Sequence, residues 1–97
     1  MSGPTPLLRF KGGGVSDSAT TTPDVIAIPA NVRGYYLFAD AAFRIDHTSS
    51  ATVLVPDATN MGYAPAGGYT QYRHPGGTHI QIAAVTGTVV YTIGWLQ

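Results

Sequence analysis

Five side chains in this sequence have the chemistry of metal ligands or acid–base groups: Asp40, Asp46, His47, His74 and His79. Imidazole and carboxylate groups bind zinc and other divalent ions, and loops can bring three such groups together. The spacing does not favour such a site, because His74 and His79 flank a Pro-Gly-Gly turn and the sequence contains no helical histidine pair. We therefore expect structural or solvent-facing histidines and no metal site.

Other patterns of catalysis and cofactor binding are also weak. No serine lies in a G-x-S-x-G motif, the context of a hydrolase nucleophile. Two carboxylates for glycoside hydrolysis must be held at a fixed separation in a cleft, whereas Asp40 and Asp46 lie near opposite ends of one expected strand. The glycine clusters lack the G-x-x-x-x-G-K-[ST] context of a phosphate loop. We expect no catalytic residue and no cofactor, and thus a protein that is not an enzyme.

Aromatic side chains gather in or beside a long loop, where Tyr63, Tyr69 and Tyr72 precede Arg73. Tyrosine and arginine are enriched at the centres of protein interfaces. A tyrosine ring can also stack on a sugar, or it can pack inside the protein and expose only its hydroxyl. These four residues are candidate partner-binding residues, and the choice between protein, sugar and simple packing stays open at this point.

The elements that position these residues are short strands. From residue 24 onward, apolar runs alternate with turn residues, as in all-β sandwiches and barrels. The runs are rich in Val, Ile, Thr and Tyr, and helix formers such as Glu and Lys are scarce. We expect strands at residues 25–28, 34–39, 42–47, 52–55, 69–73, 79–84 and 88–96, with 7–10 as a candidate eighth. The predicted fold is all-β, a small antiparallel β-sandwich or jelly-roll-like domain.

Alternation along these strands predicts which side chains are buried. Trp95 shares a strand face with Tyr91, which places it in the core. His47 falls on an apolar face at the rim of the core, whereas His79 falls with Gln81 on a polar face. Residues 35–38 read Tyr-Tyr-Leu-Phe and are apolar on both faces. This pattern predicts a central strand covered by the opposing sheet on one side and by another subunit on the other.

The first 22 residues differ in composition from the rest of the chain. They contain three consecutive glycines and a Ser/Thr run, which cannot bury enough apolar surface to fold alone. We expect an extended N-terminal arm over residues 1–22, with the β-sandwich domain over residues 23–97. Leu7, Leu8 and Phe10 are the expected anchors of this arm on a neighbouring subunit, at a sheet edge or in a groove.

Composition limits the choice of partners. The chain has 97 residues, no cysteine, formal net charge +0 and only 10% charged residues. No basic patch is available for a phosphate backbone, so we expect no nucleic-acid partner. No run approaches the length of a membrane span and no secretory leader is evident, so we expect no membrane association and synthesis in the cytoplasm. A short neutral chain gains stability by association, which predicts a homo-oligomer with a trimer as the expected state.

Two stretches, "VIAIPANVRGYYLFADAAFRIDHTSSATV" and "YAPAGGYTQYRHPGGTHIQIAAVTGTVVYTIGWL", resemble small all-β virion proteins of tailed bacteriophages. The resemblance covers about residues 24–97 and is one of pattern, without a diagnostic motif. It implies a non-enzymatic virion protein, above all a capsid cement or decoration protein that binds the major capsid protein and stabilises the shell. A head–tail or tail-fibre component is an alternative within this class. A carbohydrate-binding module acting in host attachment is the alternative from another class.

Overall fold

The structure is a computed structural model that describes residues 10–49, 61–71 and 76–97. The strands within these residues are β1 (Phe10–Ala19), β2 (Asp24–Ala27), β3 (Gly34–Ala39), β4 (Phe43–Thr48), β5 (Gly62–Ala64), β6 (Gly67–Gln71), β7 (His79–Ala84) and β8 (Val89–Leu96). In this part of the chain, no helix has the length and apolarity needed to cross a membrane. The all-β prediction is confirmed.

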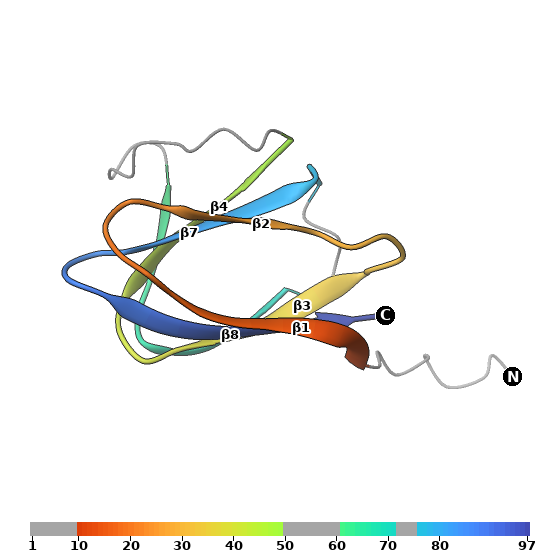
Figure 1. Cartoon of the computed structure of the whole chain (residues 1–97), viewed down its shortest axis with the longest axis horizontal. Coiled ribbons are helices and arrows are strands. Elements are labelled where there is room, and N and C mark those ends of the chain that lie inside the picture. The colour runs from red at the N-terminus through yellow and green to blue at the C-terminus, as the bar shows by residue number, and fades with distance from the viewer. Residues whose placement is uncertain (1–9, 50–60, 72–75) are drawn as a thin grey trace, which may run out of the picture.

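The strands form two four-stranded sheets that pack face to face. Sheet A has the order β1-β8-β3-β6, and sheet B has the order β2-β7-β4-β5. The antiparallel pairing is nested, because β1 pairs with β8, β2 with β7, β3 with β6, and β4 with β5. One long hairpin rolled around a two-layer core produces this connectivity, which is that of a jelly roll. Figure 1 shows the two layers, with β2, β7 and β4 in one and β1, β8 and β3 in the other.

The positions of most strands follow from the sequence pattern. The expected strands at residues 34–39 and 79–84 coincide with β3 and β7. The expected bounds of β2, β4, β6 and β8 are shifted by one or two residues. Strand β5 has only three residues and lies in a segment expected to be a loop. The expected strand at residues 52–55 lies outside the described residues.

The N-terminal segment corrects the expected domain boundary. Residues 10–19 are not part of a separate arm, because they form β1 and pair with β8 at the edge of sheet A. The boundary placed at Pro23 is therefore wrong for residues 10–22, and Pro23 itself is buried. Residues 1–9, which include the expected anchors Leu7 and Leu8, lie outside the described residues.

The three glycines that suggest a flexible arm form an irregularity within β1. The register with β8 shifts between Lys11 and Val15, as in a β-bulge. Gly13 has a φ of 86°, and a Cβ on Gly14 would lie 2.7 Å from the carbonyl oxygen of Ile93. Glycine is needed here for a strained backbone and a close strand approach rather than for mobility.

The core lies between the two sheets and follows the expected alternation. Its largest fully buried side chains include Trp95, Tyr35, Tyr91, Phe43, Leu37, Ile80, Ile82 and Ile93. The prediction that Trp95 is buried is confirmed, since it is 1% exposed. The polar face expected for β7 is wrong, because Gln81 is fully buried and His79 is half-buried. Strand β7 lies in the interior of sheet B and is buried on both faces, which simple alternation does not predict.

Candidate functional site

The outer face of sheet A exposes apolar and hydroxyl side chains. Along β3 and β8 these side chains alternate with buried ones, so Tyr36, Phe38 and Val90 point away from the core. They are 38%, 50% and 54% exposed. We call this surface the neutral face, and its described members are Ser16, Ser18, Tyr36, Phe38, Gly68, Thr70, Val90, Thr92 and Gly94. None of these side chains carries a charge.

The register of sheet A sets the members of the neutral face side by side. Phe38 lies opposite Thr92 on β8, and Thr92 lies opposite Ser16 on β1. The hydroxyls of Ser16 and Thr92 are hydrogen-bonded at 3.3 Å. This hydrogen bond lowers the desolvation free energy of the two hydroxyls, because each one keeps a partner when the face is covered.

The Tyr36 ring lies against the sheet instead of standing away from it. A Cβ built on Gly68 would meet the Tyr36 hydroxyl oxygen at 2.9 Å and ring carbons at 3.3 and 3.4 Å. Glycine at position 68 therefore makes room for the ring over the backbone of β6. The result is a low, flat aromatic surface beside Thr70, the residue opposite Tyr36.

A carboxylate marks the end of the neutral face. Asp40 follows β3, and one of its carboxylate oxygens accepts a hydrogen bond from the backbone N–H of Val90 at 2.8 Å. The backbone N–H of Asp40 donates in return to the Val90 carbonyl at 3.1 Å. Asp40 thus extends the strand pairing beyond the last β3 residue, and its charge stays at the rim.

The histidines of the described residues have structural contacts. The Tyr35 hydroxyl and His47 Nε2 are hydrogen-bonded at 2.6 Å, and the Asp46 carboxylate accepts the backbone N–H of His47. Burial raises the pKa of Tyr35 far above its usual value, and the neighbouring Tyr69 raises it further, so Tyr35 keeps its proton. His47 lies at the rim of the core, as predicted.

His79 makes its own local contact, since its Nδ1 and the Thr78 hydroxyl are hydrogen-bonded at 2.7 Å. No group of three His, Cys, Asp or Glu side chains is placed to hold a metal ion in the described ranges. His74 lies outside those ranges. The described members of the candidate metal set, Asp40, Asp46, His47 and His79, therefore do not converge.

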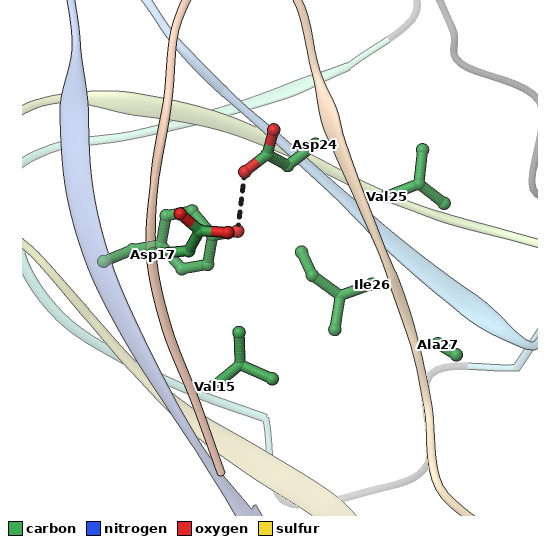
Figure 2. A pocket seen from close by; sticks show the side chains of 7 residues that line it. Val15, Asp17, Asp24, Val25, Ile26 and Ala27 are labelled. Atoms are coloured by element: carbon green, nitrogen blue, oxygen red, sulfur yellow. Dashed lines mark hydrogen bonds between the residues drawn. The ribbon is translucent and has the colours of Figure 1, made fainter.

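A cleft of about 500 Å³ opens between β1 and β2, which are edge strands of sheets A and B. We call it the edge cleft; it is lined by Val15, Asp17, Asp24, Val25, Ile26, Ala27 and Tyr91. Figure 2 shows the side chains of Asp17 and Asp24 close together, with Val15 and Ile26 beside them. Neither acid was a candidate in the sequence. Asp17 falls in the expected arm, and Asp24 precedes the first strand expected in the domain.

The Tyr91 hydroxyl is hydrogen-bonded to one of the two acids. It donates a hydrogen bond to Asp24 Oδ2 at 2.9 Å. Burial raises the pKa of Tyr91 far above its usual value, and the hydrogen bond and charge of Asp24 raise it further, as does the charge of Asp17. Tyr91 is thus a fixed donor, and the edge cleft presents two carboxylates beside an apolar wall.

The aromatic residues singled out in the sequence do not form one surface. Tyr63 is 62% exposed on β5, opposite Arg44 on the outer side of sheet B. Tyr69 instead turns into the sandwich, where its ring centroid lies 6.1 Å from that of Tyr35 and 6.4 Å from that of Phe43. Tyr69 fits the packed-ring interpretation.

The remaining candidates cannot be placed as partner-binding residues. Tyr72 and Arg73 lie outside the described residues, as do Leu7 and Leu8. Phe10 begins β1 opposite Leu96, so its backbone belongs to sheet A. The sequence signal for the neutral face was present in the doubly apolar run of β3, whereas Val90 required the observed register of β8.

Comparison of the chain with protein-family models, with curated proteins and with solved structures finds no match.

Proposed function

We propose that this chain is a non-enzymatic structural protein that docks on the protein shell of a tailed-phage virion, as a capsid decoration protein does. The observation that supports this most directly is the neutral face, with Tyr36, Phe38 and Val90 exposed together on one side of sheet A. Virion location and the major capsid protein as partner come from the resemblance in the sequence, since a jelly roll alone serves many functions.

The chemistry of the neutral face suits a protein partner. Charged residues are depleted at the centres of protein interfaces, while aromatic residues are enriched there. The described members of the face provide two aromatic rings and no charge. Burying Phe38 and Val90 removes apolar surface from water without stranding an ion, which favours association.

Repetition explains how a small face can suffice. A shell presents many equivalent sites, and an oligomer of this chain would engage several of them at once. Linked contacts of modest strength then give a high overall affinity. Self-association is part of this proposal, with the trimer expected from the sequence as its proposed state.

Binding to purified empty shells tests the proposal, with the Phe38→Asp variant as the probe. A charge in the middle of the neutral face must be desolvated on docking, so binding should fall at least about tenfold. Tyr63→Asp is the matched comparison, because Tyr63 is a similarly exposed aromatic on the other sheet and is itself a partner-binding candidate from the sequence. Loss of shell binding by Tyr63→Asp alone would assign docking to sheet B instead of the neutral face. Melting curves of both variants should match that of the unmodified chain.

Full shell binding by Phe38→Asp would contradict the proposal. A sugar is the second candidate ligand, favoured by the flat Tyr36 ring over Gly68 beside the Thr70 hydroxyl. If the chain binds host polysaccharide and not shells, and if Tyr36→Ala abolishes that binding, the protein is a carbohydrate-binding module instead.

A further inference from the structure

The edge cleft lies between two strand edges. Strands β1 and β2 are the first strands of sheets A and B, and each pairs on one side only within the described residues. An unpaired edge offers backbone N–H and C=O groups that can pair with an added strand. Side chains of such a strand alternate, so every second one can enter a pocket beside the edge.

The charge of the edge cleft is unbalanced. Asp17 and Asp24 line it, and none of its other lining residues is cationic. Tyr91 donates one hydrogen bond to Asp24, which leaves further acceptor positions on both carboxylates. Two carboxylates in one cleft repel each other, and a cation between them removes that repulsion. The cleft thus favours a positively charged group on an apolar stem.

We propose that the edge cleft receives residues 7–9 of a second copy of this chain. These residues are Leu7, Leu8 and Arg9. The guanidinium of Arg9 would bind Asp17 and Asp24, and a leucine would pack against the wall of Val15 and Ile26. The segment matches the cleft in charge and in apolar character, and arginine is well suited to bind carboxylates.

The same copy cannot supply this arginine to its own cleft. Phe10 lies opposite Leu96 and Asp17 lies opposite Tyr91, so their partners on β8 are five positions apart along the strand. At strand spacing this is roughly 17 Å, and Arg9 precedes Phe10. An arginine side chain spans less than half of that distance. The contact is therefore between copies.

This inference goes beyond docking on a shell, and it does not depend on it. It assigns a surface and a segment to self-association, whereas the neutral face stays free for another partner. It also revises the role of the expected anchors, because Phe10 belongs to β1 and only Leu7 and Leu8 remain in the docking segment. Arg9 becomes its specific contact.

Charge reversal in the full chain, without shells, tests the inference by sedimentation equilibrium. Arg9→Glu and Asp17→Arg should each weaken self-association at least about tenfold, because each breaks a charge-assisted contact. Mixing the two variants should restore association, since the intact arm of one variant fits the intact cleft of the other. In the mixture, the glutamate introduced at position 9 of one variant can also pair with the arginine introduced at position 17 of the other.

Two control variants separate this contact from a general charge effect. Arg33→Glu reverses an exposed cation away from the cleft. Asp46→Arg matches Asp17→Arg, because each carboxylate accepts the backbone N–H of the next residue at 2.8 Å. Both controls should associate like the unmodified chain. Higher salt should weaken the self-association of the unmodified chain but leave that of the Arg9→Glu variant unchanged.

Three results would overturn the inference. The first is unchanged self-association of Arg9→Glu or Asp17→Arg, and the second is a mixture that associates no better than its parts. The third is a chain that stays monomeric while Asp17→Arg loses binding to shells, which would assign the cleft to a segment of another protein. Loss of shell binding by Phe38→Asp is a separate measurement, so docking on the shell and this contact between copies can fail independently.

Discussion

The two faces of strand β3 are similar in composition and opposite in environment. The inner face carries Tyr35 and Leu37, both fully buried, and the outer face carries Tyr36 and Phe38 on the same strand. Each face thus has one tyrosine and one large apolar residue within four consecutive positions. The inner Tyr35 is hydrogen-bonded to His47, whereas the outer Tyr36 lies over the small residue Gly68.

This difference separates residues that stabilise the fold from residues available for binding. Inner residues lose contacts with the whole core when they are truncated, so their loss should appear in the free energy of unfolding. Outer residues have water on one side, so their loss should leave that free energy almost unchanged. Apolar character alone does not distinguish the two groups. Strand pairing and side-chain exposure together distinguish them.

The largest effect on the inner face should come from Trp95→Ala. Trp95 is 1% exposed, its ring meets Tyr35 edge-on at 6.3 Å, and its Nε1 donates to the Gly13 carbonyl at 3.1 Å. Truncation should lower the free energy of unfolding by about 3–5 kcal/mol. Urea unfolding followed by circular dichroism measures this change. A loss below about 1 kcal/mol would mean that the core does not depend on Trp95.

Adjacent residues of β3 give the sharpest contrast between the faces. Leu37→Ala should destabilise the protein by about 2–5 kcal/mol, because Leu37 is fully buried between the sheets. Phe38→Ala should change stability by no more than about 0.5 kcal/mol, because half of that side chain is exposed. Parallel urea melts of the two variants test the contrast. Equal losses would show that the outer face is part of the folding core.

Much of this contrast was accessible from the sequence. The Tyr-Tyr-Leu-Phe run predicts a central strand with two apolar faces, and β3 does lie between β8 and β6. Alternation along β8 also predicts the burial of Trp95, which the structure confirms. These predictions succeed because the side-chain period of a strand is local and depends on few other contacts.

The N-terminal region and the edge cleft were not accessible in the same way. A triple glycine is compatible with a flexible linker and with a bulge, and only the approach of Gly14 to Ile93 distinguishes them. The cleft brings together Asp17 of β1 and Asp24 of β2 through pairing with different strands, β8 and β7. Such non-local pairing is set by the whole fold, so no short sequence motif predicts it.

Alkaline pH should destabilise the fold through the two buried tyrosines of the inner face. Burial raises the pKa of both Tyr35 and Tyr91 above the value of about 10 that tyrosine has in an unfolded chain. Above about pH 10 the unfolded chain loses protons that the folded chain retains, so the free energy of unfolding falls as pH rises. Below that pH this contribution is fully present. Urea melts across this range measure the slope, and a flat profile would contradict the burial of the two hydroxyls.

The smallest expected effects come from removing one hydroxyl on each face. Tyr91→Phe should cost about 0.5–1.5 kcal/mol, because it removes the 2.9 Å hydrogen bond to Asp24 while the ring stays in the core. Tyr36→Phe should cost less than about 0.5 kcal/mol, since water can replace contacts of an exposed hydroxyl. Urea melts of both variants at neutral pH resolve this difference. If Tyr36→Phe costs as much as Tyr91→Phe, the outer tyrosine contributes to the fold and the contrast between the faces fails at this pair.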